Sequence, residues 1–192
     1  MTTLREAFKE WAVICRALAD GRQAVILRKG GIAETRGTFE VEHRRFWLYP
    51  TYVHQQRGGI LEEAFPLLER AEAERPAPNL VRLSHFAEVG GIFHVRDIVG
   101  ALKLEGLHCW SRETVRQRFE YREPGLFVFV VRIYRVAQVV ELPETAAFAG
   151  CRSWLDLGQE LSTEGATQVL EEREYYNVQH ELERRLEPMT WV

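Results

Sequence analysis

The sequence predicts an α+β fold, in which a mixed or antiparallel sheet is partly closed into a barrel and is accompanied by short helices and an acidic C-terminal helix. Two segments carry this prediction. Residues 126–136 are almost continuously apolar, which is typical of a strand buried on both faces at the centre of a sheet. Ser111 is a favourable N-cap for a helix that runs to about Phe119.

The N-terminal segment has two interpretations. Residues 4–9 have the composition of a short helix. Residues 11–18 and 23–28 are rich in β-prone side chains and flank an Asp-Gly step at residues 20–21, which predicts a hairpin. A single helix over residues 4–18 is the alternative, because apolar side chains also recur there at helical spacing. We prefer the hairpin.

The remaining elements follow from apolar periodicity and from turn residues. Strands are predicted at residues 38–41, 45–49, 80–89, 92–95 and 138–142, and helices at residues 61–74, 96–102 and 111–119. The prolines of residues 75–79 interrupt both helix and strand, so this segment is the clearest linker. Residues 1–157 are predicted to form a single α+β domain, which the linker can divide into two lobes, 1–75 and 80–157. Residues 158–192 are predicted to form an acidic helix or tail.

The net charge alone excludes few classes of function, but the charged residues are distributed unevenly along the chain. The net charge is −3, and 22 of the 25 basic residues are arginine. Residues 22–57 carry seven basic residues against three Glu, whereas residues 160–187 carry eight Glu against three Arg. The arginines suit bidentate contact with phosphate, and a codon preference for arginine is the alternative explanation.

Composition also limits the cellular context. No stretch has the roughly 20 apolar residues that span a bilayer, and the N-terminus lacks the pattern of a signal peptide. We expect a cytoplasmic protein with no membrane partner. Cys15, Cys109 and Cys151 form no CxxC pair, so they are expected to be reduced thiols rather than disulfides or zinc ligands.

A basic glycine turn is the first candidate site. Arg28 and Lys29 precede Gly30 and Gly31, whose backbone amides can cradle an anion beside the two cations. Neither a P-loop motif nor a dinucleotide-binding motif is present. A glycine hairpin with solvated basic flanks is the alternative interpretation.

An aromatic block with polar residues is the second candidate site. Tyr49 and Thr51 belong to a Phe-Trp-Leu-Tyr-Pro-Thr run, and His54 and Gln55 follow it. Alternate side chains of a strand share a face, so one set of aromatics packs in the core and the other can stack on a base. Tyr49, His54 and Gln55 are predicted to contact a base or another planar ligand, and packing in the core is the alternative.

Four more residues complete the candidate set. Arg118 and Arg132 are predicted to be secondary phosphate contacts, and ion pairs within the protein are the alternative. Glu34 and His43 are acid–base candidates if the protein is an enzyme, but no catalytic residue is assigned. The sequence has no HxH, HExxH or paired-carboxylate motif, so neither a metal nor a cofactor is expected.

These blocks resemble a bacterial family, the domain of unknown function 1802 family, over about residues 4–157. The matching features are Glu10-Trp11, residues 27–34, residues 46–51 with His54-Gln55, Trp110, Arg118-Phe119, residues 132–135 and residues 150–154. Members that are fused to Mrr-type restriction endonuclease domains imply a place in restriction or another DNA-targeting system. The second half is also similar to small β-barrel domains related to pseudouridine synthase and archaeosine transglycosylase modules, some of which read modified bases.

The sequence therefore predicts a non-enzymatic module that binds DNA or RNA or recognises a modified base, linked to bacterial restriction or defence. Two alternatives stay open. One is a hydrolase that acts on nucleic acid or on a phosphorylated small molecule, with Glu34 and His43 or His54 in acid–base roles. The other is a protein-interaction subunit that docks a partner through its acidic C-terminal segment. The oligomeric state is not predicted.

Overall fold

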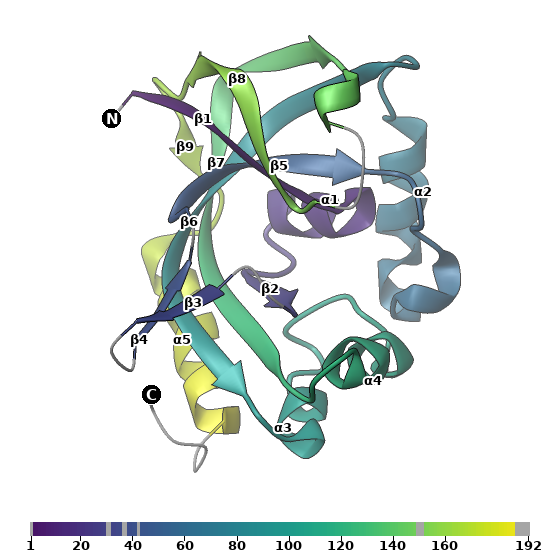
Figure 1. The fold of residues 1–192 in the computed structure, drawn as a ribbon, viewed down its shortest axis with the longest axis vertical. Helices are drawn as coiled ribbons and strands as arrows, with labels where there is room; N and C mark the ends of the chain where they lie inside the picture. The colour runs from purple at the N-terminus through teal and green to yellow at the C-terminus, as the bar shows by residue number, and fades with distance from the viewer. Residues whose placement is uncertain (1, 30–31, 36–37, 42, 149–151, 187–192) are drawn as a thin grey trace.

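A mixed sheet with helices around it forms the protein (Figure 1). The computed structural model describes residues 2–29, 32–35, 38–41, 43–148 and 152–186. The strands are β1 (Thr3–Trp11), β2 (Val25–Arg28), β3 (Ile32–Thr35), β4 (Thr38–Val41), β5 (Arg45–Thr51), β6 (Leu80–Val95), β7 (Leu126–Pro143), β8 (Trp154–Ser162) and β9 (Thr167–Gln168). The helices are α1 (Ala12–Ala19), α2 (Phe65–Ala73), α3 (Ile98–Lys103), α4 (Arg112–Glu120) and α5 (Glu172–Leu186).

Two long strands form the frame of the sheet. β6 and β7 pair antiparallel along most of their length, and both span the lower and upper halves of the molecule in Figure 1. The prediction of a central strand at residues 126–136 is confirmed, since β7 lies between β2 and β6. The predicted strands 80–89 and 92–95 are one strand, because an irregularity between Val89 and Gly91 shifts the register without ending the pairing.

The predicted α+β class is confirmed, but the predicted barrel is wrong. The strand order is β2-β7-β6-β5-β1-β8, with β9 on β7, and within the described residues the end strands β2 and β8 do not pair. β2 pairs with residues 127–130 in the lower half of the molecule, whereas β8 pairs with β1 in the upper half (Figure 1). The two edges therefore lie too far apart along the long strands to close the sheet.

The predicted N-terminal hairpin is also wrong, and so is the helix over residues 4–18. β1 pairs in parallel with β5 and antiparallel with β8, and α1 follows it directly. Every side chain of α1 except Arg16 is buried. A helix that is apolar on nearly all sides has no polar stripe, so its sequence is easily mistaken for a buried strand.

The other helices agree more closely with their patterns. Ser111 caps α4 by accepting a hydrogen bond from the amide of Thr114 at 3.3 Å, as predicted. A short 3-10 turn (Glu62–Ala64) precedes α2 within the predicted helix 61–74. The acidic helix α5 packs on the chain through Tyr175, Leu182 and Leu186, which are buried.

Residues 75–79 do not separate the strands on either side of them. β5, which precedes this segment, pairs with β6, which follows it. Among the described residues, no helix combines the length and apolarity needed to cross a membrane. Cys15 and Cys109 are free thiols, and Cys151 lies outside the described residues.

Candidate functional site

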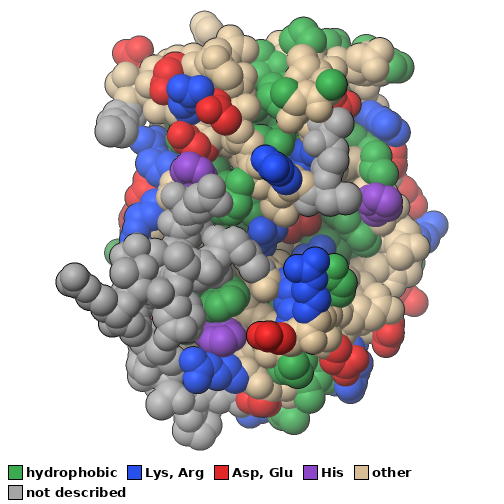
Figure 2. Space-filling view, viewed as in Figure 1, with side chains coloured by type: hydrophobic (Ala, Val, Ile, Leu, Met, Phe, Trp, Pro, Cys, Tyr) green, Lys and Arg blue, Asp and Glu red, His purple; other side chains and the backbone are tan. Residues whose placement is uncertain are grey.

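A cavity of about 740 Å³, here called the main cavity, opens where β1 and β5 end. Lys9 and Trp11 come from β1, and Thr51 and His54 from β5 and the loop after it. Residues 75–81, 144–146, 148 and 152–153 complete the lining. Figure 2 shows basic side chains around a hollow near the middle of this face of the molecule. The cavity thus brings together four segments that are far apart in the sequence.

The lining of the main cavity is basic and partly aromatic. It includes Lys9, Arg75 and Arg152, whereas Glu144 is the one carboxylate among its described residues. The Arg75 guanidinium lies 4.7 Å from the ring centroid of Tyr52, which also lines the cavity. Three cations against one anion favour an anionic ligand, and the aromatic side chains favour a planar one.

Two residues of the lining have an unusual backbone conformation. His54 has a φ of 73° and Asn79 a φ of 66°, and a third described non-glycine residue with positive φ, Arg122, lies elsewhere. Histidine and asparagine tolerate this left-handed region better than most residues. The amide of Glu144 donates to the carbonyl of Asn79 at 2.7 Å, which ties the two sides of the cavity together.

The residues of the predicted aromatic site lie in or beside the main cavity. The Thr51 hydroxyl donates to the backbone carbonyl of Glu10 at 3.0 Å. Tyr49 is buried, and its hydroxyl donates to Oε1 of Glu144 at 2.9 Å. Burial and the contact with Glu144 raise the pKa of Tyr49, so the phenol stays protonated. Gln55 is turned away, because its Oε1 accepts from the amide of Val13 at the start of α1 and its amide group contacts Glu72.

A charged cluster consists of Glu10, Arg28 and Arg118. Glu10 stands between the lining residues Lys9 and Trp11 and is buried, whereas the two arginines are partly exposed. Glu10 is 5% exposed, and its Oε1 accepts from the amide of Trp11 at 2.7 Å and lies 3.8 Å from Nη2 of Arg118. The Arg118 guanidinium lies 3.7 Å from the ring centroid of Trp110 and donates to a backbone carbonyl of β2. Two of the predicted phosphate contacts therefore share one internal carboxylate.

Burial decides the protonation behaviour of this charged cluster. It lowers the pKa of Arg28 to about 10, with Glu10 opposing the change and Arg118 adding to it. Burial likewise lowers the pKa of Arg118, again opposed by Glu10. The Arg28 guanidinium also lies 4.3 Å from the ring centroid of Phe8. Both arginines stay cationic at neutral pH, and Glu10 supplies the compensating charge.

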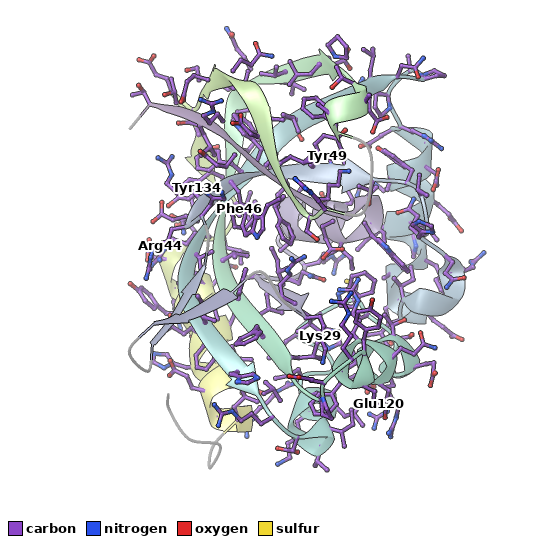
Figure 3. All side chains as sticks on the ribbon, viewed as in Figure 1. Lys29, Arg44, Phe46, Tyr49, Glu120 and Tyr134 are labelled. Carbon is purple, nitrogen blue, oxygen red and sulfur yellow. The ribbon has the colours of Figure 1, made fainter. Side chains whose placement is uncertain are left out.

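Lys29 lies at the end of α4, away from the main cavity. Its ammonium donates to the carbonyls of Phe119 at 2.7 Å and Gly125 at 2.9 Å, and also contacts the carbonyl of Glu123. Figure 3 shows Lys29 beside Glu120 in the lower half and Tyr49 in the upper half. Burial lowers the pKa of Lys29. Gly30 and Gly31, the other half of the predicted anion site, lie outside the described residues.

Replacing Lys29 with methionine is expected to lower the free energy of unfolding by about 1–2 kcal/mol, because carbonyls at a helix end lose a charged donor. Chemical denaturation followed by circular dichroism measures the change. Lys103→Met is the matched control, since Lys103 is exposed in the last turn of α3. Unchanged stability together with weaker nucleic-acid binding would instead support a phosphate contact at Lys29.

The remaining predicted residues are dispersed. Arg132 joins β7 to α5: its guanidinium lies 4.0 Å from the ring centroid of Tyr175 and donates to the hydroxyl of Tyr176 at 3.2 Å. The His43 ring lies 5.3 Å from that of Trp154. Glu34 belongs to β3, in the separate two-stranded sheet. Within the described part of the chain, no group of three or more His, Cys, Asp or Glu residues could hold a metal ion.

A second, smaller cavity of about 100 Å³ contains candidate nucleophiles in unreactive states. Burial raises the pKa of the Cys15 thiol well above its usual range. His85 accepts from Nε of Arg135 at its Nε2, so Nδ1 carries the proton that faces the Ser84 hydroxyl at 2.8 Å. Burial, with Arg135 and Arg16, lowers the pKa of His85 to about 4. This arrangement neither deprotonates the serine nor forms the thiolate.

Among the lining residues that sequence reasoning missed, five carry the charges and one of the aromatic rings of the main cavity. They are Lys9, Trp11, Arg75, Glu144 and Arg152. One signal for them was the Glu10-Trp11 step, which belonged to the family resemblance. Another was the presence of only three lysines, which makes each one conspicuous. Arg75, Glu144 and Arg152 carry no local pattern, since only the tertiary fold brings them together.

Comparisons with known proteins place the chain as follows. The family model described as Domain of unknown function (DUF1802) matches residues 7–181. The crystal structure of ASCH from Zymomonas mobilis is 15% identical, with 91% of this chain and 93% of that chain covered and a TM-score of 0.40. The crystal structure of a mutant form of that ASCH protein is 15% identical, with 91% and 96% covered and a TM-score of 0.45. Curated proteins gave no match.

Proposed function

Because the chain belongs to the DUF1802 family, a membership that brings no activity with it, we propose a function from the main cavity: the protein is a nucleic-acid-binding module that holds one unpaired nucleotide there. The observation that carries the proposal is the composition of the lining. Three cations from three segments surround one cavity together with Trp11 and Tyr52.

The size of the main cavity supports a ligand as large as a nucleotide. Its volume of about 740 Å³ lies within the range of roughly 300–1,000 Å³ that is usual for small-molecule sites. A base in a duplex exposes only its edge, so a ligand in this cavity has to be single-stranded or flipped out of the stack. The cations would contact phosphate, and the aromatic rings would stack on the base.

Replacing Arg75 with glutamine is expected to weaken binding of single-stranded RNA or DNA about five- to tenfold at low salt, because one phosphate contact is lost. Fluorescence anisotropy with labelled single strands and duplexes, over a salt series, measures the affinity and its salt slope. The slope is expected to fall by about one unit in the variant.

Arg184→Gln is the matched control for Arg75→Gln. It removes the same charge from an exposed arginine on α5, which lies at the lower left in Figure 1, away from α2 and the end of β5. Equal weakening by both substitutions would point to non-specific attraction. If none of the polymers binds even at low salt, the proposal is wrong.

Recognition of a modified base within a restriction or defence system is the finer proposal, and only the family resemblance supports it. Binding of methylated and unmethylated strands of one sequence tests it. A protein partner for the acidic helix α5 also stays a prediction: the helix buries Tyr175 but leaves Tyr176 46% exposed. The acid–base roles of Glu34 and His43 stay predictions too.

A further inference from the structure

Glu144 is fixed in the main cavity at two points. Its amide donates to the carbonyl of Asn79 at 2.7 Å, and its Oε1 accepts from the Tyr49 hydroxyl at 2.9 Å. Tyr49 is 1% exposed and packs edge-on against the ring of Phe148, so the donor itself is held in place. The raised pKa of Tyr49 keeps its proton on the phenol. The Glu144 carboxylate is therefore a positioned acceptor.

The hydrogen bond from Tyr49 uses only a small part of the acceptor capacity of the Glu144 carboxylate. A carboxylate has about four acceptor positions, and Tyr49 occupies one. Oε2 of Glu144 has no hydrogen-bond partner among the described residues. A ligand that enters the cavity next to this carboxylate has to offer N–H or O–H donors, or else it removes water from the carboxylate without replacing the lost hydrogen bonds.

The four bases differ in the donors that they offer along one edge. Guanine has a ring N–H next to an exocyclic amine, so two parallel donors match the two oxygens of a carboxylate. Adenine and cytosine place an acceptor nitrogen beside the amine, and uracil places its N–H between two carbonyls. Each of these three bases presents at least one acceptor, which the carboxylate of Glu144 would repel.

We propose that Glu144, oriented by Tyr49, makes the main cavity selective for guanine. The inference rests on the proposed function, because it assigns a base to the nucleotide that the cavity would hold. Arg75 and Arg152 would contact the phosphate of this nucleotide, whereas Glu144 reads its base. Glu144 is exposed, so water pairs with an oxygen that the base leaves unused; a base with one donor therefore binds more weakly than guanine by one charge-assisted hydrogen bond.

Isothermal titration calorimetry of the full chain with GMP, IMP, AMP, CMP and UMP tests the selectivity. IMP is the sharpest comparison, since it differs from GMP only by the missing exocyclic amine. GMP is expected to bind at least tenfold more tightly than IMP and than the other three. Glu144→Gln is expected to reduce this preference to threefold or less, and Tyr49→Phe to reduce it partly by freeing the carboxylate.

Glu141→Gln is the matched control, because Glu141 lies on β7 in an exposed pair with Arg82 and does not line the cavity. Its preference for GMP is expected to equal that of the unmodified protein. Equal affinity of the unmodified protein for all five nucleotides would overturn the selectivity and leave the proposed function standing. Failure of all five to bind would overturn both.

Discussion

Replacing Glu10 with alanine is expected to lower the free energy of unfolding by about 3 kcal/mol, because the charged cluster then keeps two partly buried guanidiniums without their buried carboxylate. The amide of Trp11 also loses its acceptor. We place the effect at the lower end of the usual range, since Arg118 keeps its contacts with Trp110 and with a backbone carbonyl. Urea unfolding followed by circular dichroism measures it.

Two further variants show which part of the effect of Glu10→Ala comes from the lost charge. Glu10→Gln keeps an oxygen for the amide of Trp11 and removes only the charge, so it is expected to cost about half as much. Glu113→Ala removes an exposed carboxylate from α4 and is expected to change stability by less than about 0.5 kcal/mol. If Glu10→Ala proved as mild as Glu113→Ala, the charged cluster would contribute little to the fold.

The stability of the protein is expected to fall by about 2 kcal/mol between pH 7.5 and pH 5 through His108 alone. His108 is 4% exposed between α3 and α4, and its Nδ1 accepts from the amide of Trp110 at 3.2 Å. Burial lowers its pKa from 6.5 to about 4, against an opposing effect of Glu105. Between pH 6.5 and pH 4 the unfolded chain binds a proton at His108, whereas the folded chain leaves the ring neutral. The contribution of His108 to the free energy of unfolding is therefore fully present above pH 6.5 and is lost as the pH falls towards 4.

A comparison of pH dependences isolates this histidine. Urea unfolding at pH 7.5 and at pH 5 gives the loss of unfolding free energy between these two pH values. This loss should be smaller in His108→Gln than in the unmodified protein by about 2 kcal/mol. His180→Gln, at an exposed position on α5, is the control and should leave the pH dependence unchanged. An unaltered pH dependence in His108→Gln would show that the ring does not resist protonation.

The parts of the fold that sequence predicted well are those with a strong local signal. The apolar run of β7 needs burial on both faces, and the cap at Ser111 satisfies helix amides within its own turn. α1 was missed because tertiary burial overrode its β-prone composition. The barrel was predicted wrongly because nothing local encodes where the edges β2 and β8 lie relative to one another.

In the candidate site, too, some relations between residues are local in the sequence and others depend on the fold. Thr51 and His54 come from one short segment and line the main cavity, and Tyr49 of the same segment contacts Glu144 of that lining. Their contact with a ligand stays a prediction. Lys29 and Arg132 looked equally suited to phosphate, but carbonyls in and after the last turn of α4 surround the first, and side chains of α5 contact the second. A sequence shows that a residue carries charge, whereas only the fold shows which neighbours already neutralise it.

The position of β1 has a consequence for how the chain folds as it is made. This strand is synthesised before both of its partners, β5 and β8, and β8 begins only at residue 154. β2 can pair only after residues 127–130 of β7 have been synthesised. Both strands therefore keep an unpaired edge until these later residues are synthesised, and other nascent chains could pair with that edge in the interval.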